Sequence, residues 1–218
     1  MNTVNNKILV LDFDHTCYDT DLFLAKEIEG EIFFGINTNS IKWRKIYKNL
    51  TKSGYTIERH IRGVSRNYRS YQNKKHKASK IAEGINFSRY LYPDTKEFIS
   101  KAKKLGYTVI LLSFGEPSWQ NKKVFGSGIG KMIDTIQYTK VHGSKARLLG
   151  EMCGNSKKIV YVENNGPDLD DVAMLLPQVK RYLMKRESAH NKTESGIIAS
   201  IKTKHTHVEV NSFKKVKI

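Results

Sequence analysis

Cysteine is scarce in this sequence. Cys17 and Cys153 are the two cysteines among 218 residues. They form no Cys-x-x-Cys pair, which argues against a zinc site and against a disulfide framework. No histidine partner accompanies Cys17, so we expect this thiol to be a packing residue.

Long hydrophobic runs are also missing. The polar start, Met1–Lys7, leads into an apolar run that is too short for the hydrophobic part of a signal peptide. No stretch approaches the length needed to span a membrane. The sequence therefore predicts a cytoplasmic protein with no membrane partner.

Acidic residues are few relative to basic ones. The chain has 38 Lys and Arg against 21 Asp and Glu, which gives a formal charge of +17. Such a balance favours polyanions or phosphorylated ligands as partners, although a generally basic, solvated surface would look the same. With 39% hydrophobic and 10% aromatic residues, the chain can bury a core. Its length allows one large domain or a core with a smaller inserted domain.

The stretch Ile8–Thr16 stands out from the rest of the chain. Four apolar residues run directly into Asp12 and Asp14, and a short apolar run of this kind predicts a buried strand. The two-residue period of a strand then places both carboxylates on the same side of its end. A divalent cation and a polar ligand would explain the pair. The alternative is a strand that ends in a solvated Asx turn, with Asp14 capping a helix.

Further buried strands alternate with helices along the chain. We expect strands at 107–112, 133–138, 158–162, 182–184 and 207–213, and helices after Pro93 and at 117–125, 145–152 and 170–176, with Asp170 as the N-cap of the last. This alternation is typical of a parallel sheet, where ligands bind at the carboxyl ends of the strands. Ser113 and Glu163 end two of the strands, so we expect them near Asp12 and Asp14.

The segment Asp19–Leu91 contains no strand pattern and is predicted to be mostly helical, with helices over Ile41–Leu50 and Ile57–Tyr71. It is strongly basic, and His60 and His76 within it are expected at the surface. Glu58 is the one acid among thirteen basic residues between positions 42 and 80: Lys42, Arg44, Lys45, Lys48, Lys52, Arg59, Arg62, Arg66, Arg69, Lys74, Lys75, Lys77 and Lys80. Aromatic residues alternate with them, and they could stack nucleic-acid bases or simply pack the helices.

Four motifs resemble those of the haloacid dehalogenase (HAD) superfamily of phosphohydrolases. Asp12-Phe-Asp-His-Thr16 matches the first motif, Ser113 the second, Lys145 the third, and the acidic segment Glu163–Asp171 the fourth. Lys140 is a poorer match than Lys145 for the third motif. The resemblance implies an α/β fold, a Rossmann-like three-layer sandwich with a central parallel sheet and a mostly helical cap inserted after the first strand.

The resemblance also implies a domain division. Residues 1–18 and 92–218 would form the core, in which 187–218 is a basic, partly flexible tail, and residues 19–91 would form the cap.

In this family, the residues that match the motifs have defined roles. The resemblance implies that Asp12 is the nucleophile, that Asp14 is the acid and base, and that Ser113 and Lys145 bind the phosphate. It further implies Mg²⁺ as the cofactor, held by Asp12, Asp14, and Glu163 or Asp168. The fourth motif departs from the usual pattern because Glu163 stands where an Asp is common, so which acid reaches the metal stays open.

Two functions remain open at this point. The first is a phosphatase that acts on a small phosphorylated substrate such as a nucleotide, a sugar phosphate or a nucleic-acid end. The second is a binding protein for nucleic acid or a protein partner, attached through the basic cap and with weak activity. Asp14 favours a phosphatase over a dehalogenase, because the dehalogenases of this family lack that residue.

Overall fold

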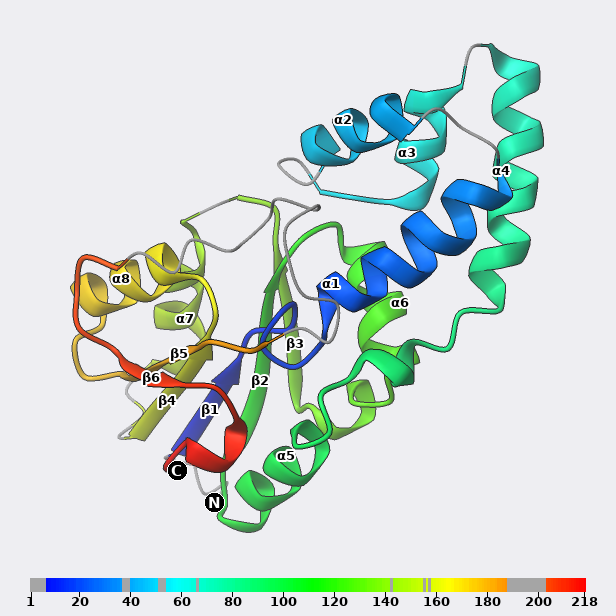
Figure 1. Ribbon diagram of the computed structural model, residues 1–218. Helices are drawn as coiled ribbons and strands as arrows, with labels where there is room; N and C mark the ends of the chain where they lie inside the picture. Colours follow the sequence, from blue (N-terminus) through cyan, green and yellow to red (C-terminus); the bar gives the residue numbers. More distant parts are fainter. Residues whose placement is uncertain are drawn as a thin grey trace.

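The computed structural model describes residues 7–36, 40–50, 54–65, 67–141, 143–154, 156, 158–187 and 203–218. Six parallel strands form one sheet in the order β3-β2-β1-β4-β5-β6 (Figure 1). Their bounds are β1 Lys7–Leu11, β2 Thr108–Phe114, β3 Thr135–Thr139, β4 Lys158–Glu163, β5 Lys180–Met184 and β6 Val208–Val210. All six predicted strands are therefore confirmed, with bounds that differ by a few residues.

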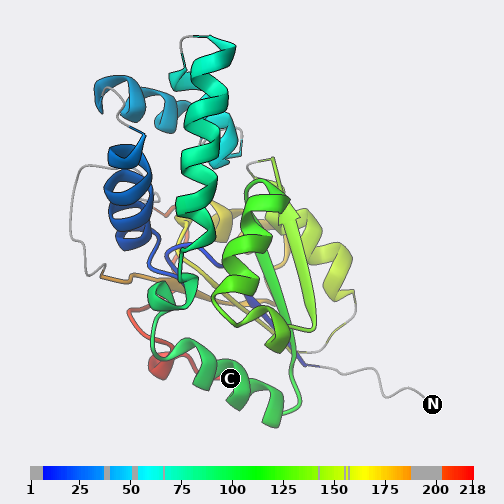
Figure 2. The same ribbon diagram turned by 90° about the vertical axis from the view of Figure 1, so that its right-hand side faces the viewer.

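Helices cover both faces of the sheet, which makes the three layers predicted from the sequence. One face packs against α5 (Thr95–Lys104) and α6 (Pro117–Gly126), and the other packs against α7 (Lys145–Cys153) and α8 (Gly166–Leu175) (Figures 1 and 2). The alternation along β1 divides its side chains between two cores, since Leu9 and Leu11 face the first layer and Ile8 and Val10 the second.

Between β1 and β2 the described chain is helical, and most of it forms a lobe at the end of the sheet where β1 and β2 finish (Figure 1). Its elements are α1 (Thr20–Phe23), the π-helical segment η1 (Leu24–Phe33), α2 (Ser40–Leu50), α3 (Ile57–Val64), α4 (Tyr68–Glu83) and the 3₁₀ turn η2 (Phe87–Tyr90). Two further 3₁₀ turns, η3 (Gly130–Met132) and η4 (Phe213–Lys215), lie outside this lobe.

One helix predicted over Ile57–Tyr71 is two helices in the structure. Ser65 is extended (φ −79°, ψ 146°) and ends α3, and the side chain of Asn67 accepts a hydrogen bond from the Ser70 N–H at 2.9 Å. A polar N-cap of this kind satisfies a donor that the helix itself leaves unpaired, which starts a new helix. The prediction of continuity was wrong because the hydrophobic spacing continues across the break.

His60 was expected at the surface, and this prediction was wrong. Its side chain is fully buried between helices α2 and α3 and stacks on Trp43, with ring centroids 3.6 Å apart. Both ring nitrogens have partners, since Nε2 lies 2.9 Å from the Trp43 carbonyl and Nδ1 lies 3.2 Å from the Tyr55 hydroxyl. These bonds offset the cost of burying an imidazole. His76 is exposed, as predicted.

The role predicted for Asp170 was also wrong. Helix α8 begins at Gly166, with Pro167 in its first turn, so Asp170 lies inside the helix and does not cap it. Its carboxylate accepts hydrogen bonds from the backbone N–H groups of Lys204 and His205 at 2.7 and 3.0 Å, and it lies 2.9 Å from His207 Nε2. Asp170 therefore anchors the chain that leads into β6.

The end of the chain packs against the core through two buried side chains. Phe213 and Val216 are buried, and Phe213 stacks on Phe98 of α5 with centroids 4.6 Å apart. The flexible part expected within 187–218 falls largely on residues 188–202, which lie outside the described residues. No helix in the described part of the chain has the length and apolar character needed to cross a membrane.

Candidate active site

A cavity of about 420 Å³ opens at the carboxyl ends of β1, β2 and β4. All of the residues that the sequence singled out for chemistry line this cavity: Asp12, Asp14, Ser113, Lys145, Glu163 and Asp168. The first and the last of these residues are more than 150 positions apart in the sequence. The parallel sheet brings them together because its strands end at the same edge.

A tight loop after β1 sets the positions of Asp12 and Asp14. The backbone N–H of Asp12 still bonds to the Val162 carbonyl of β4 at 3.0 Å, which fixes Asp12 at the sheet edge. His15 then adopts a positive φ of 59°, a conformation that histidine tolerates better than most residues. The N–H groups of Cys17 and Tyr18 return to the Phe13 carbonyl at 2.9 and 3.1 Å.

Lys145 is the cation at the centre of the site. Its Nζ lies 2.8 Å from Asp12 Oδ1, 2.6 Å from Glu163 Oε2 and 3.4 Å from Asp168 Oδ2. The side chain is 4% exposed. Burial lowers its pKa, but the three carboxylates outweigh burial and hold the pKa well above the ordinary value. Lys140, the poorer candidate, is exposed and pairs with Glu116 at 3.0 Å.

The carboxylates of this cluster are short of positive charge. Burial raises the pKa of Asp12, and the neighbouring Glu163 carboxylate raises it further. Burial likewise raises the pKa of Glu163. One ammonium group faces three carboxylates, so an additional cation or bound protons must balance the remaining charge.

Glu163 already has a protein donor on each of its oxygen atoms. Oε2 accepts from Lys145 and, at 2.5 Å, from the Tyr161 hydroxyl. Oε1 accepts from the backbone N–H groups of Asn164 and Asn165, both at 3.0 Å. This carboxylate is therefore arranged to hold Lys145 and the turn after β4.

Asn164 is a residue of the site that the sequence reasoning did not select. One terminal atom of its amide lies 3.0 Å from the Asp14 carbonyl oxygen, 3.1 Å from Glu163 Oε1 and 3.2 Å from Asp12 Oδ2. With nitrogen at this position, the amide donates to the acceptors around it. With oxygen there, four oxygen atoms converge, an arrangement that a bound cation would stabilise.

The oxygen atoms around Asn164 fit Mg²⁺, which prefers carboxylate, carbonyl and amide oxygen ligands. Asp12, the Asp14 carbonyl and Asn164 would hold the ion. Among the residues that the structure describes, no group of three or more His, Cys, Asp or Glu side chains is arranged to hold a metal.

The Asp14 carboxylate is held by three side chains and caps no helix. It accepts from Lys123 Nζ at 2.5 Å, from Thr20 at 2.6 Å and from Gln120 at 2.8 Å. Burial raises its pKa, but the Lys123 charge outweighs burial, and the pKa falls to about 2. The solvated Asx turn considered as an alternative is therefore excluded.

Lys123 and Gln120 were not selected from the sequence either. They lie three residues apart on α6, which puts them on one face of that helix. Gly115 makes room for Gln120, because a Cβ at this position would lie 2.6 Å from Gln120 Nε2. Hydrophobic spacing alone does not indicate which face of α6 meets Asp14, so the sequence offered no clear signal.

Three buried polar atoms around the cavity have no hydrogen-bond partner among the described residues. They are Ser113 Oγ, Gln120 Oε1 and Asn165 Oδ1, and all three side chains line the cavity. A buried hydroxyl or amide without a partner is costly, unless a ligand supplies one. These atoms could therefore bind a polar ligand next to Asp12.

Comparisons with known proteins show similarity in fold but not in sequence. No family model matches the sequence, and no curated protein sequence matches it. Among solved structures, a haloacid dehalogenase-like hydrolase from Burkholderia xenovorans covers 95% of both chains with a TM-score of 0.70 at 16% identity. A predicted phosphoglycolate phosphatase from Haemophilus somnus covers 97% of this chain and 96% of its own, with a TM-score of 0.58 at 15% identity.

A third structure, the HAD hydrolase YfnB from Bacillus subtilis bound to magnesium, covers 95% of both chains with a TM-score of 0.59 at 13% identity. An L-2-haloacid dehalogenase also matches. The chain thus has the fold that these phosphatase-like and dehalogenase-like hydrolases share.

Proposed function

Taking the haloacid dehalogenase-like fold as the premise, we propose that this protein is a Mg²⁺-dependent phosphohydrolase that cleaves a phosphate monoester through an aspartyl-phosphate. The observation that carries the proposal is the position of Asp12. This carboxylate is buried at the base of the cavity, bonded to Lys145, beside a Ser113 hydroxyl without a partner.

Each step of the proposed reaction has a residue. In the first step, an Asp12 oxygen forms a bond to phosphorus while the ester oxygen leaves with a proton. In the second, water attacks the phosphorus of the aspartyl-phosphate and restores the carboxylate. Asp14 is the acid and base: its protonated form gives the proton to the leaving ester oxygen in the first step, and the resulting carboxylate takes a proton from the attacking water in the second. Its pairing with Lys123 favours the ionised form that the second step uses.

The remaining residues of the site would bind the phosphate and hold the nucleophile. Ser113 would donate to a phosphate oxygen, and Lys145 would stabilise the negative charge next to Asp12. Bound Mg²⁺ would reduce the repulsion between the Asp12 carboxylate and the phosphate. We propose that Glu163 and Asp168 position Lys145, with Asn164 at the metal in place of an acid.

The test is phosphate release from a panel of monoesters with Mg²⁺ and with EDTA. We expect metal-dependent release by the wild type, none by Asp12→Asn, and a loss of two to three orders of magnitude in Lys145→Met, roughly the effect of removing one stabilising donor. Asp171→Asn and Lys140→Met are matched controls that should retain activity.

Two outcomes would contradict the proposal. One is phosphate release by Asp12→Asn at the wild-type rate. The other is halide release from a 2-haloalkanoate without any phosphate release, which would identify a dehalogenase.

A second candidate function rests on the outer surface of α4. A hollow of about 400 Å³ there is lined by Arg69, Lys74 and Lys77, together with Ile36, Asn67, Ser70 and Asn73. Such a surface would bind the backbone of a nucleic acid. Affinity for single-stranded DNA should then fall steeply with salt, and Arg69→Gln with Lys77→Gln should reduce the salt slope. Undetectable binding at low salt would exclude this function.

A further inference from the structure

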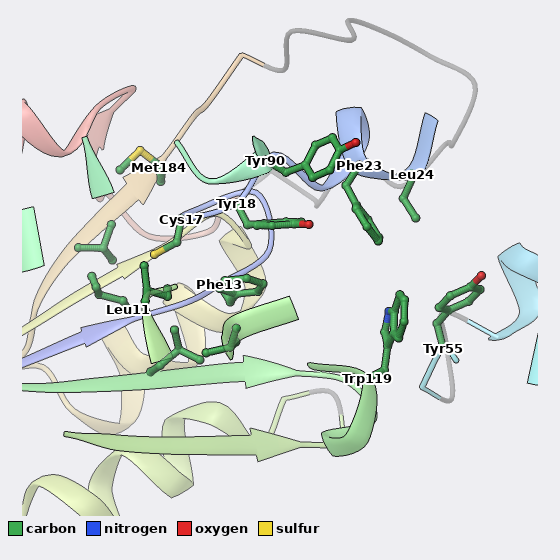
Figure 3. Close-up of a cluster of buried hydrophobic side chains, with 14 of the residues drawn as sticks. Leu11, Phe13, Cys17, Tyr18, Phe23, Leu24, Tyr55, Tyr90, Trp119 and Met184 are labelled. Atoms are coloured by element: carbon green, nitrogen blue, oxygen red, sulfur yellow. The ribbon is translucent and has the colours of Figure 1, made fainter. Parts of the chain in front are cut away.

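The cavity at the candidate active site has two chemically different halves. The charged and amide side chains around Asp12 form the floor. The outer part is walled by five apolar or aromatic side chains, Phe23, Leu24, Tyr47, Tyr55 and Trp119. In Figure 3, Trp119 and Tyr55 lie next to each other, with Phe23 and Leu24 across from them.

The aromatic wall is built from three separate parts of the chain. Phe23 and Leu24 come from the α1–η1 junction, Tyr47 and Tyr55 come from α2 and the segment before α3, and Trp119 comes from α6. The ring of Trp119 lies 6.1 Å from Phe23 and 6.0 Å from Tyr55, between centroids. The rings therefore join the helical lobe to the sheet-bearing part.

The wall is fixed before any ligand arrives. The Tyr55 hydroxyl lies 3.2 Å from His60 Nδ1, and His60 stacks on Trp43, so the ring of Tyr55 is held by the interior of the lobe. Trp119 is 8% exposed and is also packed against Phe87. Because the rings are already ordered, a ligand that stacks on them loses little to side-chain ordering.

The basic residues of the lobe contribute little to this cavity. Of the eleven described basic residues between positions 42 and 80, Lys48 is the one in its lining. The outer half therefore presents ring faces and methyl groups, with few cations for a second anionic group. A cavity of about 420 Å³ lies in the range that takes a small ligand.

We propose that the substrate is a phosphate monoester whose leaving group carries a planar aromatic ring, packed against Trp119 and Tyr55. This inference rests on the proposed phosphohydrolase function. The ring could belong to an aryl-substituted alcohol or to the base of a nucleoside monophosphate, which share the same planar chemistry. Trp119 is a specificity residue in this account, because it contacts the leaving group and not the phosphate.

Two pairs of substrates isolate the ring from the reactivity of the leaving group. Adenosine 5′-monophosphate and ribose 5-phosphate both leave through a primary alcohol, and so do 2-phenylethyl phosphate and ethyl phosphate. We expect kcat/KM to be roughly ten- to a hundredfold higher for at least one ring-bearing member than for its partner, which is the usual size of aromatic stacking. The pair with the larger ratio of kcat/KM values shows whether the ring belongs to a nucleoside base or to an aryl-substituted alcohol.

Variants then test whether the aromatic side chains of the cavity cause the difference in kcat/KM between ring-bearing and ring-free esters. Trp119→Leu should lower kcat/KM about tenfold more for the preferred ring-bearing ester than for its ring-free partner, through KM. Tyr55→Phe keeps the ring and should keep the preference. Tyr68→Leu, which removes a 76% exposed ring elsewhere on the lobe, is the control. Should Trp119→Leu not fold, as judged by circular dichroism, Tyr47→Leu replaces it.

Failure of this inference can be told apart from failure of the proposed function. Equal kcat/KM within both pairs would overturn the inference and leave the phosphohydrolase standing. If nothing is hydrolysed, calorimetry on the wild type decides. Tighter binding of the ring-bearing esters, weakened by Trp119→Leu, would then support the aromatic site without the reaction. Equal binding within each pair would overturn it.

Discussion

Two lysines determine the electrostatics of the candidate site, and only one of them was predictable from the sequence. Lys145 begins α7 and holds Asp12, as the motif order indicated. Lys123 is 4% exposed and lies 2.5 Å from Asp14 Oδ1, yet no motif indicated it. Its Nζ also lies 5.4 Å from the centre of the Phe13 ring and 5.8 Å from that of Tyr18. The ammonium group thus has defined partners on several sides, which fixes the orientation of Asp14.

Removing Lys123 should therefore disable the site. We expect Lys123→Met to lower kcat roughly a hundredfold, because Asp14 loses both its orientation and its countercharge. Lys122→Met changes the exposed neighbour on the same helix and should leave kcat unchanged. Steady-state kinetics on one ring-bearing and one ring-free ester provide the comparison. Equal kcat values for the two variants would show that the Lys123–Asp14 pair has no part in turnover.

At the scale of elements, the buried stack of Trp43 and His60 holds α2 and α3 together. The sequence predicted helices in this region but not their junctions, because Gly63-Val-Ser-Arg-Asn continues the hydrophobic spacing while the backbone turns at Ser65. It also gave no sign that His60 would be buried, since a histidine between arginines resembles a surface residue. Burial lowers the pKa of His60 to about 4, against the opposing bond to the Trp43 carbonyl.

The stability of the lobe should depend on this histidine. The unfolded chain, with a histidine pKa of about 6.5, binds a proton more readily than the fold does. The contribution of His60 is therefore fully present above about pH 6.5, and it is lost as the pH falls toward 4. The loss should amount to roughly 3 kcal/mol.

Urea unfolding at pH 7.5, 5.5 and 4.5 measures the effect of this histidine. The wild type should lose more stability on acidification than His60→Gln, whereas His76→Gln, at an exposed position on α4, should follow the wild type. Parallel pH profiles for wild type and His60→Gln would mean that His60 does not resist protonation.

At the scale of the whole molecule, a buried ion pair ties distant segments together. Arg186 forms two bonds to Asp94, at 3.0 and 2.8 Å, and its Nε donates to the Thr16 carbonyl at 3.2 Å. The same carboxylate accepts from Ser212 and from the Phe213 N–H. This pair connects the start of α5, the loop after β1 and the end of the chain. It holds the end of the chain against the core, where Phe213 and Val216 are buried.

Breaking this pair should destabilise the protein as a whole. Arg186→Met leaves a buried carboxylate without its cation and should lower the free energy of unfolding by about 3 to 5 kcal/mol at pH 7. Burial raises the pKa of Asp94, but Arg186 outweighs burial and holds it below its ordinary value. The pair therefore stabilises the fold above the unfolded pKa and loses this effect as the pH falls through the folded one.

The control for Arg186→Met is Arg147→Met, which breaks an exposed pair with Glu151 and should cost less than about 1 kcal/mol. Thermal or urea unfolding compares the two variants. Equal losses would contradict the central position assigned to Arg186.

The strands and most of the site were predictable because they depend on local patterns of apolar and polar residues. Short apolar runs ending in polar residues located the parallel strands and the edge at which Asp12, Ser113 and Glu163 meet. Contacts between segments far apart in the sequence, such as Lys123 with Asp14 or Arg186 with Asp94, depend on how those segments pack together, and no local pattern records that. The position of Asn164 beside Asp12 was not predictable either, because the motifs of the site contain acids, a serine and a lysine but no amide.

The central claim is that Asp12 carries the phosphoryl group. The most direct measurement is mass spectrometry of the peptide containing Asp12 after acid quenching during turnover of a ring-bearing ester with Mg²⁺. We expect a peptide heavier by HPO₃ in the wild type and no such addition in Asp12→Asn. Rapid phosphate release with this peptide unmodified at every quench time, or with the added group on another residue, would contradict it.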